Sequence, residues 1–372
     1  MSSGENSTAA GGKIPFDQCT PEICPYERSF YQYRLWLAPN VAFASLFAVS
    51  LLAYVGVYAF TRRGAVFTLA MVLGLICEID GYVGRIMNWR DQWSSTGFIM
   101  QTTSLTFAPA FLAAGIYLCL RKIVRAFGPE NSRIPPEYYT RVFIPCDVVC
   151  LLTQATGGTI AALAARNRKS TDTGDTVIMV GLALQVATLL AFIGLALDFA
   201  LRTLRRRRAL GSAAALDQSP ALVAVRGSRA FRGFAAALAL STACVFARCV
   251  FRVVELSGGY AGPLIARQDL FVAFEGVMIG VAVAALNVFH PSLCFPDRRR
   301  RGGSSSGSAG RPKRVSVNSF EREFVGDSLG PCGFENPPKL STSSSLDESV
   351  SSNAYAWQSS VPTRDLTRRP KA

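Results

Sequence analysis

The stretch Glu78-Ile79-Asp80-Gly81-Tyr82-Val83-Gly84-Arg85 places acidic and basic side chains inside an apolar run over residues 65–87. This run is long enough to cross a bilayer as a helix. At helical spacing, one face of that helix carries Glu78, Gly81, Tyr82 and Arg85. A charged side chain in mid-bilayer costs about 2.5–3.5 kcal/mol on insertion scales. The face is therefore predicted to line the polar interior of a helix bundle, where other polar residues of the chain are its partners.

The composition is typical of a membrane protein. Half of the 372 residues are hydrophobic and only 17% are charged, and the apolar residues come in blocks of about 20 residues. Seven such blocks are predicted to cross the membrane as helices, at residues 38–60, 65–87, 97–120, 142–165, 177–200, 231–256 and 270–290. The predicted fold is an all-α, polytopic seven-transmembrane helix bundle.

The distribution of Lys and Arg predicts the orientation. These residues are concentrated in the first, third and fifth connections between the blocks and directly after the last block. By the positive-inside rule, the N-terminus lies outside the cell and the C-terminus lies in the cytoplasm. The predicted organisation is an extracellular tail (1–37), a seven-transmembrane domain (38–296) and a disordered cytoplasmic tail (297–372), which is rich in Ser, Gly and charge.

The N-terminal tail carries two features that fit an extracellular location. Asn6-Ser7-Thr8 matches a glycosylation acceptor, and Cys19 and Cys24 are close enough in sequence to form a short disulfide loop. The alternative is a chance sequon and two free thiols, and the sequence leaves both interpretations open.

Several function classes are disfavoured. A single histidine argues against a multi-histidine metal site, and the chain lacks the G-x-x-x-x-G-K-[ST] motif of an intrinsic ATPase. The net charge of +14 lies in the loops and tail, which the membrane topology explains without nucleic acid. We expect no metal, no cofactor, no catalytic residue and no enzymatic activity.

The other apolar blocks also carry polar residues that would lie within the membrane. The third block holds Gln101 and a mid-span Pro109, which removes a backbone hydrogen bond and kinks a helix. Further candidates for a polar core follow in later blocks: Asp147, Gln154, Gln185, Arg248, Arg252, Glu255 and Glu275. Gly157-Gly158 would let a neighbouring helix come close. Because acids and arginines are nearly balanced, ion pairs between neighbouring helices are predicted.

Such a network has two interpretations. The ion pairs could simply hold the helices in register, with no solute touching them. Alternatively, part of the network lines a cavity for an amphipathic cation or a lipid headgroup, with a surplus carboxylate as its counter-ion and arginines that bind anions. The spacing of the residues does not identify the surplus carboxylate.

The order and type of these motifs, over residues 30–296, resemble the fungal lipid-translocating exporter family. Its members are seven-helix proteins linked to 7-aminocholesterol resistance, sphingoid-base release and protoporphyrin uptake. The residues that carry the resemblance are Glu78-x-x-Gly81-Tyr82-x-x-Arg85, Gln101 with Ala108-Pro109, Asp147 with Gln154, Gly181 with Gln185, Arg248-x-x-x-Arg252-x-x-Glu255 and His290-Pro291. The resemblance implies a multi-pass plasma-membrane protein of a fungus that moves or senses an amphipathic lipid-like compound, often in stress or drug resistance.

The leading hypothesis is a transporter that exports an amphipathic lipid or toxic hydrophobe, with membrane lipids and the substrate as its partners. Without an ATP site, such movement is downhill, gradient-coupled or driven by a partner. The alternative is a seven-helix receptor or sensor whose cytoplasmic tail recruits signalling partners.

Overall fold

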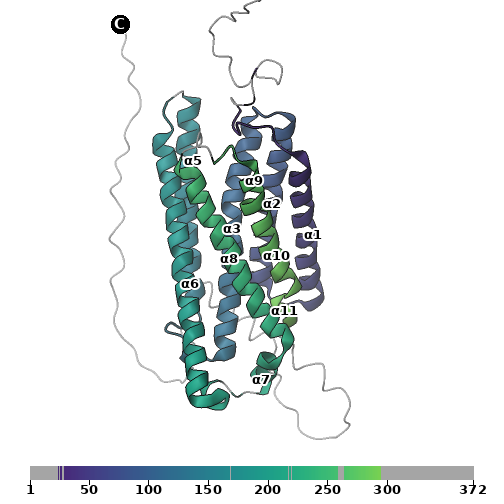
Figure 1. The fold of residues 1–372 in the computed structure, drawn as a ribbon, viewed down its shortest axis with the longest axis vertical. Helices are drawn as coiled ribbons and strands as arrows, with labels where there is room; N and C mark the ends of the chain where they lie inside the picture. The colour runs from purple at the N-terminus through teal and green to yellow at the C-terminus, as the bar shows by residue number, and fades with distance from the viewer. Residues whose placement is uncertain are drawn as a thin grey trace, which may run out of the picture. The chain divides into compact units, whose positions relative to one another are not determined.

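The structure, a computed structural model, describes residues 24, 26, 29–167, 169–216, 218, 220–258 and 264–294. The described part is all-helical, which confirms the predicted fold class. Seven helical segments are long and apolar enough to cross a membrane (Figure 1). The first six are α1 (Leu37–Thr61), α2 (Ala65–Arg90), α3 (Ser95–Phe127), α5 (Phe143–Arg166), α6 (Asp172–Ala215) and α8 (Arg229–Ser257).

The seventh segment, Gln268–Cys294, is a composite. It consists of α9 (Gln268–Phe271), a π-helical turn η4 (Val272–Val277), α10 (Met278–Val288) and α11 (Pro291–Cys294). Three short helices lie in the connections, namely η3 (Pro129–Asn131), α4 (Tyr138–Arg141) and α7 (Pro220–Gly227). Each predicted block corresponds to one of the seven segments, so the apolar pattern located all of them.

The helix ends differ from the predicted blocks where polar residues continue a helix. The fifth block was expected to end at residue 200, but α6 runs on to Ala215 and includes the Arg205–Arg208 run. Arginine, alanine and leucine are good helix formers, so a helix can continue beyond its apolar part. Gly211, with φ of 74°, interrupts the regular geometry near the end of α6.

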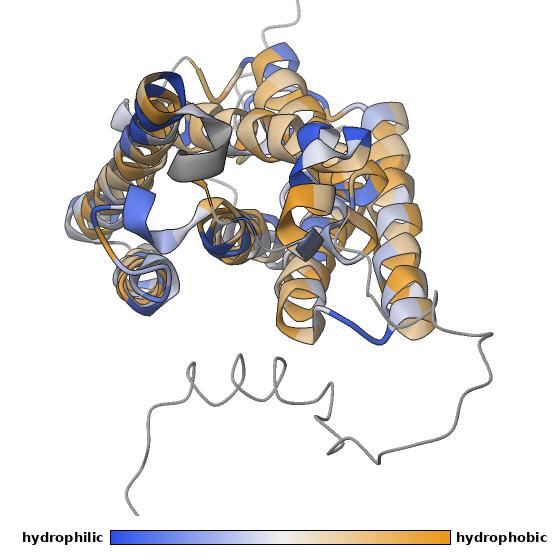
Figure 2. Cartoon of the chain, turned by 90° about the horizontal axis from the view of Figure 1, so that it is seen from below, coloured by the Kyte–Doolittle hydropathy of each residue, from blue (hydrophilic) through white to orange (hydrophobic). Residues whose placement is uncertain are grey.

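Large apolar side chains cover the outside of the bundle, and several charged side chains are buried inside it. Phe60, Leu52 and Val49 are 93%, 69% and 66% exposed, whereas Glu78 and Arg248 are fully buried. Figure 2 shows apolar residues along most of the length of the helices. This inverted arrangement is suited to a hydrocarbon surrounding, in which polar groups must be satisfied inside the protein.

Glycines allow two helix pairs to pack closely. A Cβ atom on Gly84 of α2 would lie 2.8 Å from the Gly97 carbonyl oxygen and 2.9 Å from the Gln101 nitrogen of α3. On the α5–α6 pair, a Cβ atom on Gly157 would lie 2.7 Å from the Ile178 nitrogen, as the sequence predicted. The prediction was wrong for Gly158, because its Cβ would meet no atom within 4 Å. Small residues at such crossings bring helix backbones into direct contact.

Helix α8 links these two helix pairs. Helix α8 contacts α10, α6 and α3, and it passes between α6 and α10 in Figure 1. Helix α3 contributes many of the buried residues of the main apolar core. The polar residues on α8 and α3 therefore lie where most of the helices meet.

Candidate functional site

The central site is formed by Glu78, Arg248 and Glu275, from α2, α8 and η4. Glu78 is fully buried, and neither of its carboxylate oxygens has a hydrogen-bond partner among the described residues. The charged groups of Glu275 and Arg248 are its electrostatic neighbours. Burying a carboxylate without a donor is costly, and such a group calls for a cation or a hydrogen-bond donor.

Arg248 connects three elements at the central site. Its Nε donates to Glu275 Oε1 at 3.1 Å, and its Nη2 donates to the same oxygen and to the Leu105 carbonyl oxygen of α3. Leu105 lies four residues before Pro109, which has no N–H to donate to that carbonyl. Pro109 therefore leaves the Leu105 carbonyl oxygen without a backbone donor, and this oxygen accepts the hydrogen bond from Arg248.

Local backbone geometry places the remaining members of the central site. Glu275 lies in the π-helical turn, a feature that often marks functional sites because it redirects a side chain within a helix. Gly81 lets Leu105 approach, since a Cβ atom there would lie 2.5 Å from the Leu105 side chain. The Tyr82 ring packs against Phe47, 5.7 Å between centroids, and its hydroxyl has no hydrogen-bond partner among the described residues.

The charges of the central site do not cancel. Two buried carboxylates, Glu78 and Glu275, share one guanidinium, Arg248. The second oxygen of Glu275 also lacks a hydrogen-bond partner within the described part of the chain. With both acids ionised, the site carries one net negative charge and three free acceptor oxygens, which suits a monovalent cation that donates hydrogen bonds.

Arg85 lies two helical turns from Glu78 on α2 and has neutral partners, so its predicted pairing with an acid was wrong. Its Nε donates to Asn40 Oδ1 at 2.8 Å, and Nη1 and Nη2 donate to Gln101 Oε1 at 3.4 Å and the Tyr33 hydroxyl at 3.1 Å. The guanidinium carbon also lies 3.8 Å from the ring centroid of Phe271. Amide and phenol oxygens together with an aromatic face stabilise this buried cation in place of a carboxylate.

Residues 29–36, here called the N-terminal strap, cover this end of the bundle. Tyr31 is buried; its hydroxyl donates to Gln101 Oε1 at 2.6 Å and accepts from Asn88 Nδ2 at 2.9 Å. Burial raises the pKa of Tyr31, and the nearby Arg85 charge opposes this only in part, so the phenol stays neutral. Gln92 Nε2 donates to the Tyr33 carbonyl at 2.7 Å. The strap thus closes over Arg85 with polar contacts to α2 and α3.

The strap was missed by sequence reasoning, which treated residues 1–37 as one polar tail. A signal was present in the alternation of Tyr31, Tyr33 and Leu35, which is typical of an extended segment with one buried face. Tyr31 and Leu35 are each 2% exposed. Their packing means that the helical domain includes residues upstream of α1.

Replacing both Tyr31 and Tyr33 by phenylalanine is expected to loosen the strap. The double variant removes hydrogen bonds to Gln101, Asn88 and Arg85, and leaving buried partners unsatisfied costs about 1–3 kcal/mol. Amide hydrogen exchange of residues 29–36 should quicken at least fivefold, while exchange in α5 should not change. Tyr138→Phe, at a half-exposed tyrosine, is the control. Unchanged exchange of the strap in the double variant would contradict the role of these hydroxyls.

The other predicted core residues form separate pairs. Arg252 Nη1 donates to Glu255 Oε2 at 2.6 Å within α8, and Gln154 Nε2 donates to Gln185 Oε1 at 3.1 Å between α5 and α6. The first pair confirms that Arg252 has an acid beside it, although on its own helix. Both pairs are buried, which favours a role in holding the helices together.

Asp147 of α5 does not contact an arginine, so the predicted ion pairing between neighbouring helices does not include it. Its neighbour is the Tyr117 hydroxyl of α3, although the geometry does not complete a hydrogen bond. Sequence reasoning also passed over Asp80, whose Oδ2 accepts from the Ser104 hydroxyl at 2.5 Å. Its place in the opening stretch, two residues after Glu78, was the available signal.

A family described as "RTA1 like protein" matches residues 71–298, more than half of the chain. The chain belongs to the RTA1-like family. Among the relatives is the sphingoid long-chain base transporter RSB1 of Saccharomyces cerevisiae, which is 29% identical over 283 residues, or 70% of this chain and 74% of the relative.

Two further relatives come from the same yeast. Protoporphyrin uptake protein 1 is 28% identical over 216 residues, covering 58% of this chain and 65% of the relative. Protein RTA1 is 25% identical over 288 residues, covering 71% of this chain and 85% of the relative. No solved structure matches the chain. The resemblance inferred from the motifs is therefore confirmed, and this RTA1-like protein is a multi-pass membrane protein.

The matched segment contains the central site but not the strap. Glu78, Arg248 and Glu275 all lie within residues 71–298, as do Asp147 and its neighbour Tyr117. The strap and Asn40, which contact Arg85, lie before it. The central site is thus built from the segment that defines the RTA1-like family, whereas the cover over Arg85 is built in part from residues outside it.

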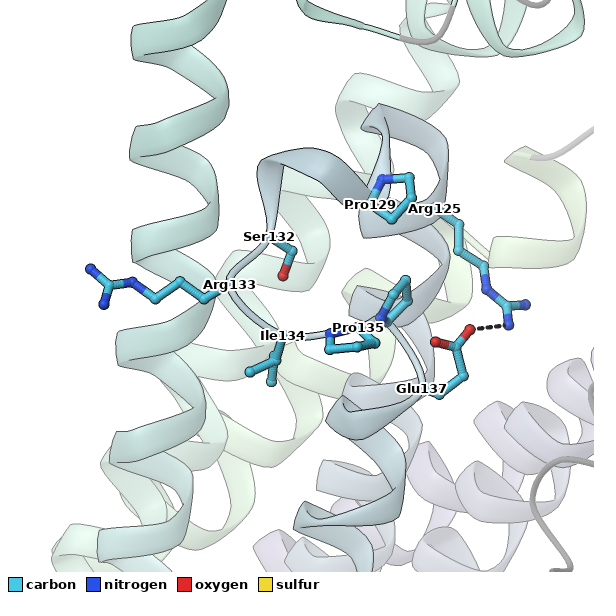
Figure 3. Close-up of a pocket in the computed structure, with 8 residues that line it drawn as sticks. Arg125, Pro129, Ser132, Arg133, Ile134, Pro135 and Glu137 are labelled. Atoms are coloured by element: carbon cyan, nitrogen blue, oxygen red, sulfur yellow. Dashed lines mark hydrogen bonds and ion pairs between the residues drawn. The ribbon is translucent and has the colours of Figure 1, made fainter.

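A surface pocket of about 510 Å³ lies at the connection between α3 and α5, apart from the central site (Figure 3). In Figure 3, Arg125 points toward Glu137, and their contact measures 2.6 Å. Burial raises the pKa of Glu137, but the hydrogen bond from Arg125 and the nearby arginine charges outweigh it, so the pKa lies below its usual value. Arg133, on the far side, pairs with Asp198 at 3.0 Å. These pairs tie the connection to the helices of this RTA1-like protein.

The predicted features of the terminal tails fall mostly outside the described residues. Asn6, Cys19 and residues 297–372 are not among them. Cys24 is described and is disulfide-bonded, while the other seven described cysteines are free. The Cys19–Cys24 pair, the glycosylation at Asn6 and the partners of the cytoplasmic tail stay predictions.

Proposed function

We propose that this protein translocates an amphipathic lipid-like compound with a cationic headgroup, such as a sphingoid base or a sterol-like amine, and so contributes to resistance against toxic hydrophobes. The observation that carries this proposal is the Glu78 carboxylate, which is fully buried and has no hydrogen-bond partner in the described part of the chain. In this proposal the protein moves its substrate and performs no chemistry on it.

An ammonium headgroup matches what the central site lacks. It supplies one positive charge and several N–H donors to the free oxygens of Glu78 and Glu275. Charge-assisted hydrogen bonds of this kind are about twice as strong as neutral ones. Arg248 holds Glu275 in place but leaves Glu78 without a donor, so the headgroup completes the site and does not compete with the arginine.

An apolar layer next to the central site suits the rest of an amphipathic molecule. It includes a residue seven positions from each of the groups that form the site: Met71, Leu112, Ser241 and Ala282. Seven residues are two turns of a helix, or about 10 Å, so each helix presents a polar and an apolar position on one face. A headgroup at Glu78 would thus have apolar side chains beside its tail.

One relative supports the same class of substrate, since it is named a sphingoid long-chain base transporter. A sphingoid base is a single-chain amine, which agrees with the charge of the central site. We place the protein in the plasma membrane, as the family resemblance implies, with its N-terminus outside, as the basic connections indicate. We infer that movement is downhill, gradient-coupled or partner-driven.

The test is efflux of a labelled sphingoid base from cells that express Glu78→Gln at the wild-type surface level. We expect at least a tenfold loss of efflux, because the amide keeps the shape but removes the charge that attracts the ammonium group. Asp80→Asn is the matched control on the same helix, since Asp80 is bonded to Ser104, and it should retain most activity. Wild-type efflux by Glu78→Gln would exclude the central site from transport.

A further inference from the structure

Asp147 lies in a second buried polar site that the central site does not use. The residue is 4% exposed, and neither carboxylate oxygen has a hydrogen-bond partner among the described residues. The Tyr117 hydroxyl beside it is also buried, close to the carboxylate but without the geometry of a complete hydrogen bond. Among the described residues, a neutral phenol is thus the donor beside this buried carboxylate, which leaves the carboxylate poorly satisfied.

The surroundings of Asp147 come from three helices. Cys150, one turn further along α5, and Cys249 of α8 are its electrostatic neighbours, and Tyr117 is contributed by α3. None of these groups carries a positive charge, so they supply no counter-ion to an ionised Asp147. Within the described residues, no group of three His, Cys, Asp or Glu side chains could hold a metal ion. A cation that donates hydrogen bonds would supply the charge that these groups lack.

The Asp147 site and the central site both lie beside α8. Arg248 contacts Glu275, and the next residue, Cys249, has both Asp147 and Glu275 as electrostatic neighbours. Cys249 thus lies near both acids, so the two sites are neighbours beside α8. A molecule that leaves one carboxylate would find the other nearby.

We propose that Asp147 and Tyr117 form a second binding site for an alkylammonium headgroup, so that the protein holds two cationic amphipaths at once. This inference rests on the proposed function, because it assumes the same class of substrate. Asp147 accepts the ammonium N–H groups and supplies the opposite charge, and Tyr117 offers its hydroxyl oxygen as a further acceptor. Asp147 follows the basic third connection, which places this site toward the predicted cytoplasmic end, where an exported substrate would enter.

The experiment measures binding stoichiometry with tritiated sphinganine on the purified full chain in lipid nanodiscs, with empty nanodiscs as background. We expect two molecules per wild-type chain, one for Asp147→Asn, one for Glu78→Gln, and none for the double variant. Tyr117→Phe keeps the carboxylate, so it should retain two sites with the affinity of one weakened three- to tenfold. Asp198→Asn, at an acid paired with Arg133 and Arg202, should bind as wild type.

The outcomes separate this inference from the proposed function. One molecule per wild-type chain, unchanged in Asp147→Asn and absent in Glu78→Gln, overturns the second site and leaves the central site standing. No specific binding to the wild type overturns both. Folding is followed by thermal unfolding without ligand: Asp147→Asn removes an unpaired buried charge at nearly constant volume, so its Tm should equal or exceed that of the wild type.

Discussion

Replacing Arg248 by methionine is expected to destabilise the protein by about 3–5 kcal/mol, because breaking a buried ion pair leaves an uncompensated charge. In this protein the cost falls on two acids, since Glu275 loses its pair and Glu78 loses its only nearby guanidinium among the described residues. The Leu105 carbonyl, which Pro109 leaves without a backbone donor, would lose its hydrogen bond as well. Methionine keeps much of the side-chain volume, so the change tests charge and not packing.

The measurement is unfolding of the purified variants in mixed micelles. Adding Glu275→Gln to Arg248→Met should recover at least half of the lost stability, because one orphaned charge is removed. Arg267→Met is the matched control: Arg267 pairs with Asp269 at 2.7 Å, but both are more than half exposed, so its loss should cost under about 1 kcal/mol. If Arg248→Met costs no more than Arg267→Met, the central ion pair does not stabilise the bundle.

Replacing Gly84 by alanine is expected to separate α2 from α3 and cost about 2–3 kcal/mol through overpacking. The added methyl group would lie 2.8 Å from the Gly97 carbonyl oxygen and 2.9 Å from the Gln101 nitrogen, and neither backbone atom can rotate away. Because Gln101 accepts hydrogen bonds from Arg85 and Tyr31, a shift of α3 would also disturb the contacts under the strap.

The control for this change is Gly158→Ala. The added methyl group at Gly158 meets no atom within 4 Å, and alanine is favoured over glycine in a helix by about 1 kcal/mol. Thermal unfolding and surface expression should therefore fall for Gly84→Ala and stay equal or rise for Gly158→Ala. Equal stability of the two variants would show that the α2–α3 crossing adjusts at little cost.

The helical spacing predicted burial correctly for the charged residues of the opening stretch and of α8. Glu78, Arg85, Arg248 and Arg252 are all less than 9% exposed. This prediction worked because the cost of a charge in hydrocarbon depends on the residue and its depth, and both can be read along one helix. The same reasoning did not identify partners, because the choice between an acid and a neutral oxygen depends on which neighbouring helix supplies it.

The sequence by itself determined the seven membrane-crossing segments, their polar faces and the family, because hydrophobicity and helical period are local properties of the chain. Only the tertiary structure decided that Arg85 is held by Tyr33, Asn40 and Gln101. It also decided that Arg248 uses the carbonyl freed by Pro109, and that Glu78 is left without a donor among the described residues. These contacts join residues that lie up to 143 positions apart in the sequence. They follow from the crossing of whole helices, which no local spacing specifies.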